Sequence, residues 1–251
     1  MRRWKWAALV AVGCWVGCGG GGSLPSDKQV PPVTMPDGPV ILPEVPGGTG
    51  TPAPDPFTSL YPLTTGSTWT YRIEDPSVAT GPFEKQVVVV GEQPVPETSE
   101  TAIEVRSTQP HLEEVSWQKE KDGVVYRLRE EDHKAGTLAR VTTWSPAAMK
   151  SLALERPQGW SFVSSLTELT RYPTGTKKDD TDKKKYTWSV EAVNETVTTP
   201  AGTFPNAIRL QRKREDKVEP VRTYWLVPGI GKVKETGERT EELTAYDVKK
   251  P

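Results

Sequence analysis

Residues 114–129 read EVSWQKEKDGVVYRLR and decide the expected fold. Apolar and polar residues alternate on both sides of the Asp122-Gly123 pair, which is the pattern of a strand with one buried face. Asp-Gly is a strong hairpin signal because glycine accepts a positive φ angle. The stretch therefore predicts an antiparallel hairpin whose buried positions are Val115, Trp117, Val124, Tyr126 and Leu128.

The remainder of the chain after residue 57 repeats this strand pattern. Alternating or β-branched runs occur at 69–73, 86–90, 102–105, 138–144, 160–169, 186–192, 206–213, 221–227, 231–235 and 241–248. A single sheet of about ten strands tends to curl or close on itself. We therefore expect an all-β fold, a strongly curved antiparallel sheet that forms a half-barrel or open barrel.

Helix signals are few, and we expect at most one or two short helices. The best candidate is Ser145-Pro146-Ala147-Ala148-Met149-Lys150, which has an N-cap residue, a proline at the first helical position and good helix formers after it. This stretch predicts a helix of about two turns.

The first residues form a targeting segment. Three basic residues, Arg2, Arg3 and Lys5, precede an apolar run from Trp6 to Val16, and Gly17-Cys18 follows it. Charge, a short apolar core and a small residue are the parts of a secretory signal peptide, and the run is too short to span a bilayer. We predict a lipoprotein signal peptide at 1–17.

Two cysteines compete for the lipid. The lipoprotein pattern prefers a medium aliphatic residue three positions before the cysteine. Ala11 stands at that position for Cys14 and Trp15 stands there for Cys18, so this position favours Cys14. Cleavage before Cys18 leaves a fuller apolar core, so we predict lipidation, for example with palmitate, at Cys18, with Cys14 as the alternative. An ordinary secreted protein is the other interpretation. These are the only cysteines in the chain, so lipidation at Cys18 leaves neither a disulfide nor a free thiol.

A tether and one domain follow the signal peptide. Of residues 19–56, ten are Pro and eight are Gly, and none is aromatic. Such a segment buries too little apolar surface to offset its ordering entropy. We therefore predict a lipidated cysteine and disordered tether at 18–56, and a single β domain at 57–250.

Composition excludes several functions. The formal net charge is −1 and drops by three when the basic residues of the signal peptide are removed, so nucleic acid is not an expected partner. The two histidines, His111 and His133, stand in charged segments without a set of metal ligands, apart from a weak candidate at Glu131-Asp132-His133. No nucleophile elbow or phosphate loop is present, so we predict no catalytic residues, no metal and no cofactor.

Three blocks of sequence resemble a family. They are Tyr61-Pro62-Leu63 with Gly66 and Trp69-Thr70-Tyr71, then Val197 to Phe204, then Tyr224 to Val233. They resemble uncharacterised bacterial envelope lipoproteins whose domains are similar to the DUF3108 type. The resemblance implies an all-β, curved-sheet envelope domain and brings no catalytic residues.

The leading functional hypothesis is a non-enzymatic, lipid-anchored envelope protein that binds an apolar or polymeric ligand, or another envelope component. Its partners would be the membrane, through the N-terminal lipid, and a lipid, a polysaccharide or an envelope protein. Aromatic residues with a polar edge are natural lining for such a site, and the candidates are Trp69, Tyr71, Trp117, Tyr126, Trp188 and Trp225.

Two alternatives remain open: a structural or assembly subunit that docks through a sheet edge, and an envelope enzyme whose site is not visible in the sequence. The charge cluster from Lys177 to Lys185 is interpreted as a solvated hairpin tip or as a contact for anionic headgroups or polysaccharide. Gly19 after the predicted lipidated cysteine lacks the aspartate that retains many lipoproteins at the inner membrane, so we expect the outer membrane.

The anchor is tested by replacing the predicted lipidated residue. Labelled fatty acid should enter the wild-type protein and be lost in Cys18→Ser, because the thiol that accepts the lipid is removed. Metabolic labelling followed by immunoprecipitation measures this. Label that persists in Cys18→Ser would move the anchor to Cys14.

Overall fold

The computed structural model describes residues 40–46, 58–175 and 177–250. The predicted signal peptide, both candidate lipidation residues (Cys14 and Cys18) and most of the predicted tether lie outside the described residues.

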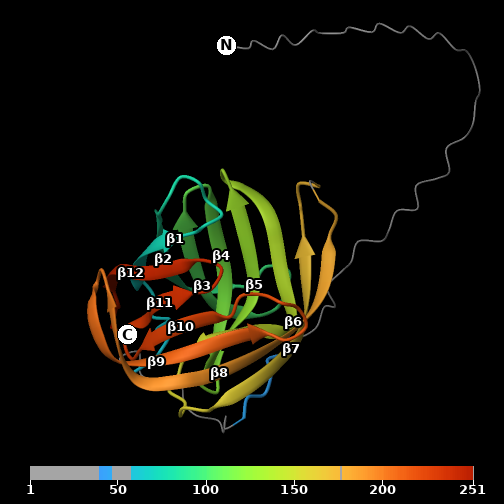
Figure 1. The fold of residues 1–251 in the computed structure, drawn as a ribbon. Coiled ribbons are helices and arrows are strands. Elements are labelled where there is room, and N and C mark those ends of the chain that lie inside the picture. The colour runs from blue at the N-terminus through green and yellow to red at the C-terminus, as the bar shows by residue number, and fades with distance from the viewer. Residues whose placement is uncertain (1–39, 47–57, 176, 251) are drawn as a thin grey trace, which may run out of the picture. The chain divides into compact units, whose positions relative to one another are not determined.

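Twelve strands form one closed antiparallel barrel (Figure 1). Each strand pairs with its neighbours in the sequence, and β1 pairs with β12 to complete the ring. The strands are β1 (Thr68–Glu74), β2 (Phe83–Pro94), β3 (Thr101–Gln109), β4 (Leu112–Lys121), β5 (Val124–Lys134), β6 (Thr137–Leu152), β7 (Ser161–Arg171), β8 (Asp180–Thr199), β9 (Gly202–Arg214), β10 (Arg222–Val227), β11 (Gly231–Thr236) and β12 (Thr240–Asp247).

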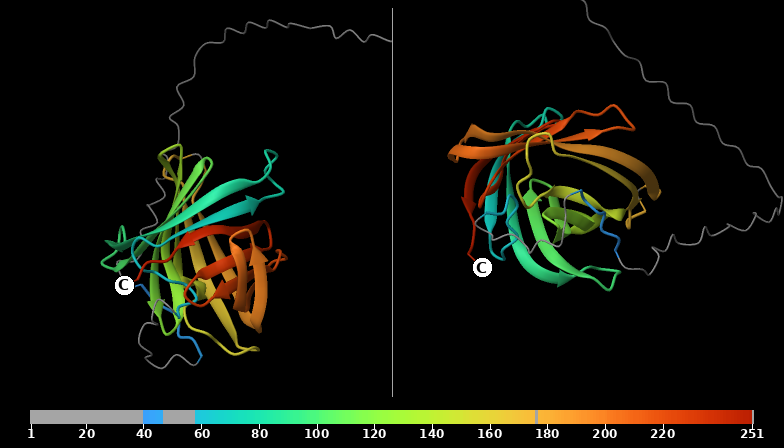
Figure 2. Two further views of the ribbon diagram at one scale, coloured as in Figure 1. Left: turned by 90° about the vertical axis from the view of Figure 1, so that its left-hand side faces the viewer. Right: turned by 90° about the horizontal axis from the view of Figure 1, so that it is seen from below.

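The closure confirms the predicted all-β fold and strongly curved antiparallel sheet. β1 and β12 are paired from Thr68 opposite Asp247 to Glu74 opposite Thr240. The structure has twelve strands where about ten were expected, and the ring is complete. Figure 2 shows the barrel from the side and from one end.

An up-and-down barrel places alternate turns at opposite ends. We call one end the base; it carries the β2–β3, β4–β5, β6–β7, β8–β9 and β10–β11 turns. The other end, the rim, carries the β1–β2, β3–β4, β5–β6, β7–β8, β9–β10 and β11–β12 turns.

The hairpin predicted at 114–129 is confirmed as β4 and β5. Asp122 has a φ of 55° and Gly123 a φ of 75°, the two positive values that a type I′ turn needs. Gly123 also holds the base together, because its carbonyl accepts hydrogen bonds from the backbone N–H groups of Ala153 and Leu154 at 2.8 and 3.1 Å.

The helix predicted from Ser145 to Lys150 is wrong. These residues belong to β6, and the described residues contain no helix, hence none long and apolar enough to cross a membrane. Thr143 pairs with Arg129 and Ala148 pairs with Arg127, so 144–147 form an irregularity opposite Leu128. Pro146, which has no N–H to give to a ladder, is accommodated at such an irregularity.

Part of the predicted tether packs against this irregularity. The backbone N–H of Ala147 donates to the carbonyl of Ile41 at 2.8 Å, and the Tyr126 hydroxyl donates to the carbonyl of Pro43 at 3.1 Å. Val45 is 6% exposed and belongs to the core. β6 and β7 pair only from Val141 to Ser145, and Ile41 hydrogen-bonds to β6 beyond that pairing. Ordered chain therefore begins before the predicted boundary at residue 57.

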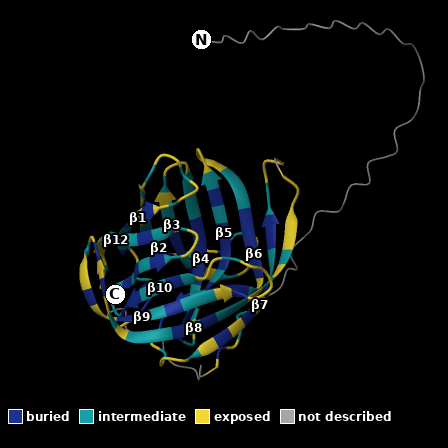
Figure 3. Cartoon of the chain, in the orientation of Figure 1, coloured by how far each residue is buried: buried dark blue, intermediate teal, exposed yellow. Residues whose placement is uncertain are grey.

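Buried side chains form two main clusters, and buried and exposed positions alternate along the strands (Figure 3). One cluster gathers Leu60, Leu152, Trp188 and Ile208 with others from β3 to β10. The second gathers Trp69 and Ile73 of β1 with Val233 and Leu243 of the closing strands, among others. The closing strands therefore have their own core.

Two turns with positive φ angles offer a matched test of packing at the base, because Gly123 lies in the β4–β5 turn of the base and Gly136 lies in the β5–β6 turn of the rim. Gly136 has a φ of 74° with nothing within 4 Å of an added Cβ, whereas a Cβ on Gly123 would meet Leu154 at 2.9 Å. Both Gly→Ala variants should lose about 1–2 kcal/mol to left-handed strain, and Gly123→Ala should lose roughly 1–3 kcal/mol more through overpacking. Urea unfolding measures both, and equal losses would contradict the close packing at the base.

Candidate functional site

The candidate site is a cavity of about 170 Å³ inside the barrel. Members of both core clusters line it, including Trp69, Val89, Met149 and Leu226. Most of its functional groups are charged, and cations outnumber anions. The cations are Lys85, Arg127, Lys150, Arg212, Arg222, Lys232 and Arg239, and the anions are Glu114, Glu235 and Glu241.

The segment that leads into β1 closes the base of the cavity. The backbone N–H of Leu60 donates to Ala153 after β6, and that of Gly229 in the β10–β11 turn donates to Ser59. The Trp69 indole donates to the carbonyl of Ile230 at 2.6 Å. A Cβ on Gly231, whose φ is 97°, would meet Pro62 at 3.3 Å. The close approach of these two segments therefore requires glycine and shuts this end.

Tyr61 of this segment lines the cavity. Burial raises the pKa of Tyr61 to about 12, although Lys232 and the side-chain amide of Gln118 act in the opposite direction. The phenol is therefore protonated at neutral pH and presents a hydroxyl group to the interior.

One side of the cavity holds a network of buried ion pairs. Glu241 is 1% exposed and is contacted by Lys85, Lys232 and Arg239 at 2.5, 2.6 and 2.6 Å. Lys232 also lies 2.5 Å from Glu235. Burial alone would raise the pKa of Glu241, but Lys232 and Lys85 outweigh burial and hold that pKa well below its usual value. These lysines are therefore committed to holding β2, β11 and β12 together.

Tyr71 completes this network from β1. Lys232 and Lys85 lie 5.0 and 5.4 Å from the centre of its ring, and its hydroxyl donates to the carbonyl of Lys232 at 2.9 Å. Burial raises the pKa of Tyr71, so this phenol too is neutral. The aromatic face supplies further stabilisation to the two ammonium groups.

Lys150 differs from these lysines because it makes no direct ion pair among the described residues, although the charges of Glu114 and Glu235 act on it. Val125 pairs with Ser151 and Tyr126 with Met149, which leaves Lys150 as the extra residue of a β-bulge. The bulge explains why three consecutive residues, 149–151, all line the cavity. Within the described part of the chain, its ammonium group makes no hydrogen bond or ion pair. Burial, followed by the charge of Arg127, lowers the pKa of Lys150 to about 7.

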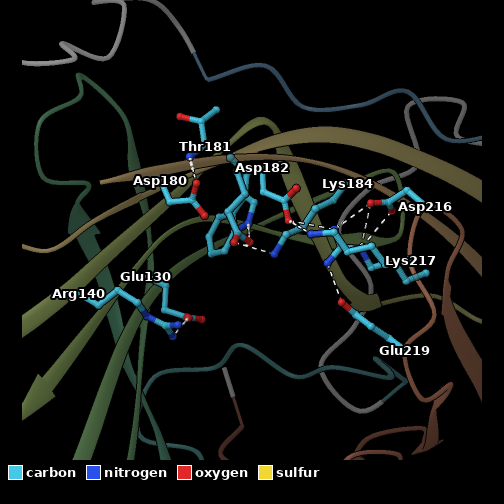
Figure 4. Close-up of polar contacts among 12 residues, drawn as sticks. Glu130, Arg140, Asp180, Thr181, Asp182, Lys184, Asp216, Lys217 and Glu219 are labelled. Atoms are coloured by element: carbon cyan, nitrogen blue, oxygen red, sulfur yellow. Dashed lines mark hydrogen bonds and ion pairs between the residues drawn. The ribbon is translucent and has the colours of Figure 1, made fainter. Parts of the chain in front are cut away.

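Arg212 is the second cation without a carboxylate partner among the described residues. Its guanidinium lies 4.8 Å from the centre of the Tyr186 ring and 5.7 Å from that of Trp188. The neighbouring Arg214 uses the nearby carboxylates: it contacts Asp182, Asp216 and Glu219 at 3.0, 2.9 and 2.7 Å (Figure 4). Aromatic faces therefore hold Arg212 in place and leave its charge uncompensated.

Arg127 lies between these two cations. Burial is the main cause that lowers the pKa of Arg127, and the charge of Arg212 lowers it further. Its guanidinium stacks over Trp144 at 4.6 Å and pairs with Glu130. Its Nε atom is buried without a hydrogen-bond partner, and so is Oε1 of Gln118, which lines the same cavity. Two unsatisfied polar atoms therefore accompany the surplus cations.

The six aromatic residues predicted as lining fall into three groups. Trp69 and Tyr71 line the cavity. Trp117, Tyr126 and Trp188 are buried members of the first core cluster, where Trp188 stacks on Tyr224. Trp225 is not among the lining residues, and its indole donates to Glu195 at 3.0 Å. Sequence reasoning missed the lysines and arginines that dominate the lining.

Three carboxylates, Glu114, Glu130 and Asp132, come within 4.8 Å of one another. Arginines occupy them, because Arg140 lies 2.8 Å from Asp132 and 3.5 Å from Glu130, and Arg127 pairs with Glu130. The Glu130–Arg140 pair is drawn in Figure 4.

The weaker metal candidate at Glu131-Asp132-His133 does not form one site. His133 lies 3.4 Å from Glu131, whereas Asp132 is paired with Arg140. Adjacent residues of a strand point to opposite faces, so the three side chains do not converge.

The charge cluster at 177–185 covers the β7–β8 turn and the start of β8. Lys184 pairs with Glu168 at 2.6 Å, and Asp182 is shared by Arg214 and Lys217. Acidic neighbours therefore balance much of its positive charge, and a contact with anionic headgroups stays a prediction.

No family model matches this chain, and no curated protein matches it. Two solved structures are similar in shape. One is a candidate exported protein with a YmcC-like fold from Bacteroides fragilis, with 12% identity, a TM-score of 0.47 and alignment over 76% of this chain and 99% of that one. The other is a candidate lipoprotein from Parabacteroides distasonis, with 14% identity, a TM-score of 0.43 and the same two coverages. The resemblance to DUF3108-type domains remains a prediction.

The buried network is tested with two neighbouring glutamates. Glu241→Gln leaves Lys85 without its counter-ion and Lys232 with Glu235 alone, and should cost about 3–5 kcal/mol. Glu242→Gln removes a half-exposed pair with Lys234 at 2.8 Å and should cost less than about 1 kcal/mol. Chemical unfolding at pH 7 measures both losses.

The stability that Glu241 contributes to the fold should depend on pH. Because the folded-state pKa of Glu241 is lowered, its contribution is complete above the unfolded pKa of about 4.3 and is lost as pH falls through the folded value. Glu241→Gln should therefore lose less stability than wild type between pH 5 and pH 2. Identical acid profiles, or equal losses for the two variants at pH 7, would contradict the network.

Proposed function

We propose that this protein is a lipid-anchored protein of the bacterial cell envelope whose barrel binds a small polar ligand. The observation that carries the binding role is the charged cavity, bounded at the base by Ser59–Leu63 and lined by Lys150 and Arg212, two cations that make no ion pair among the described residues. The signal-like N-terminus and its cysteine support the anchor and, with Gly19, an outer-membrane location.

The chemistry of the lining revises the expected ligand. Apolar ligands would cover Lys150 and Arg212 without giving them a partner, and burying an unpaired charge is strongly unfavourable. A cavity of about 170 Å³ is close to one that holds benzene, so a polymer is also a poor fit. A small polar molecule satisfies both constraints.

The two alternative functions have less support. Docking through a sheet edge has less support, because β1 and β12, the ends of the sheet, pair with each other. Among the described strands, free edges remain on β6 and β7 beyond their short pairing, and Ile41 already hydrogen-bonds to that of β6.

Catalysis by the clustered carboxylates has less support, because Arg127 pairs with Glu130 and Arg140 pairs with Asp132. Lys150, with a pKa of about 7, is an available base, but it makes no hydrogen bond or ion pair with an acid among the described residues. We therefore propose binding without catalysis.

The binding role is tested on the full chain purified from envelopes in mild detergent. Native mass spectrometry should show a bound small molecule that is released on denaturation, because the cavity retains its ligand through noncovalent contacts. Ser116, which lines the cavity and is 2% exposed, offers a variant that fills it.

Ser116→Leu should lose the bound molecule while its circular dichroism remains that of a β protein. Thr244→Leu, at a half-buried position of β12 outside the cavity lining, is the control and should keep the ligand. Absence of any bound mass in wild type, or equal retention in Ser116→Leu, would contradict a ligand in the barrel.

A further inference from the structure

The interior of the barrel has more positive charge than its own carboxylates neutralise. Lys85, Lys232 and Arg239 share Glu241, and Arg222 lies 3.6 Å from Glu235. Lys150 and Arg212 are outside these pairs, and both line the cavity. A low-dielectric interior makes such an imbalance unfavourable, so a bound anion would stabilise it.

Arg127 interacts electrostatically with each of the two unpaired cations, Lys150 and Arg212. The charge of Arg127 acts on Lys150, and the charge of Arg212 acts on Arg127, so Arg127 is repelled by each of these cations. Glu114 attracts both Lys150 and Arg127 and offsets part of this repulsion. One anionic group placed among them replaces this repulsion with attraction. Charge-assisted hydrogen bonds from lysine and arginine to an oxyanion are about twice as strong as neutral ones.

We propose that Lys150, Arg127 and Arg212 bind the oxyanion group of a small solute inside the barrel, a site that rests on the proposed binding function. The unsatisfied Nε of Arg127 supplies a further donor to the anion. The unsatisfied Oε1 of Gln118 is an acceptor and takes a hydrogen bond from a neutral hydroxyl of the same solute.

The volume limits the size of this solute. The cavity measures about 170 Å³, so it suits a molecule of about six to eight non-hydrogen atoms, judged against a 150 Å³ cavity that takes benzene. A short hydroxycarboxylate and inorganic phosphate both meet this limit, and they share the oxyanion that the three cations recognise.

Lys150 makes binding depend on pH. The charged groups that act on it are Arg127, Glu114, Lys232 and Glu235, and burial with Arg127 outweighs the acids and brings its pKa to about 7. The two acids stay ionised, because their pKa values are lowered, and Lys232 stays protonated, because its pKa is raised. A bound anion favours the protonated amine, so binding should take up a proton above pH 7.

The test is isothermal titration calorimetry on the full chain in detergent, with lactate, inorganic phosphate and lactamide as probes. Lactamide has the shape of lactate without the charge. Lactate or phosphate should bind and lactamide should not, and the tighter of the two anions tells a carboxylate solute from a phosphate. The Kd for lactate should rise about fivefold from pH 7 to pH 8 and about tenfold from pH 8 to pH 9, because the protonated fraction of Lys150 falls by those factors.

Three variants separate the role of Lys150 from general damage. Lys150→Met should weaken lactate binding at least tenfold at pH 6.5. Lys150→Arg keeps the charge without titrating, so it should bind lactate equally at pH 6.5 and pH 8.5. Lys184→Met, whose lysine pairs with Glu168 and does not line the cavity, should match wild type. If Lys150→Met does not fold, Lys150→Arg decides the question.

The contrary results are distinct. Lactamide binding as tightly as lactate, or Lys150→Arg retaining the pH dependence of wild type, would overturn the oxyanion site while leaving a ligand-binding barrel intact. If no probe binds and no bound mass is found in the native protein, the oxyanion site and the proposed function both fail.

Discussion

The pairing of β1 with β12 is the constraint on which the rest of the structure depends. It runs from Thr68 opposite Asp247 to Glu74 opposite Thr240 and turns a curved sheet into a ring. An open sheet would leave one face in water, where lysines and glutamates need no special partners. A closed ring shields that face from much of the bulk solvent, so an interior charge is stabilised by a counter-ion, an aromatic face or a ligand. Glu241, on the closing strand β12, shows the first solution, because it binds cations from β2 and β11 and from the β11–β12 turn.

The same constraint divides the interior cations by what they do. Lys85, Lys232 and Arg239 share Glu241 and therefore belong to the framework. Arg212 is held by the rings of Tyr186 and Trp188, and Lys150 is directed into the cavity by a bulge in β6, yet neither has a carboxylate partner among the described residues. The cations that share Glu241 are already paired and have little left to offer a ligand. Arg127 pairs with Glu130 but keeps a buried Nε atom without a hydrogen-bond partner. The unpaired cations keep their full attraction for an anion, which is why the binding role is assigned to them.

Local sequence patterns predicted the strands well and the site poorly. Asp122-Gly123 is a local turn signal, and the structure has the turn at that position with the expected positive φ angles. The run from Ser145 to Lys150 has equally local helix signals, but the partners of β6 lie far away in the sequence and its pairing with β5 and with Ile41 overrides them. The interior lysines were missed because a charged residue that alternates with apolar ones predicts a solvent-facing position. Lys232, Lys234 and Glu235 follow one another in β11, and only the closed ring reveals that Lys232 and Glu235 face inward.

The barrel encloses a charge-rich interior, and the ionisation of Lys150 reports whether bulk water reaches that interior freely. In the full chain with ¹³C-dimethylated lysines, NMR titration should show one lysine, assigned by its loss in Lys150→Arg, with a pKa of about 7. The ordinary pKa of a lysine side chain in water is about 10.4. A Lys150 that titrates near that value would show that water reaches it freely, and would contradict the enclosed interior.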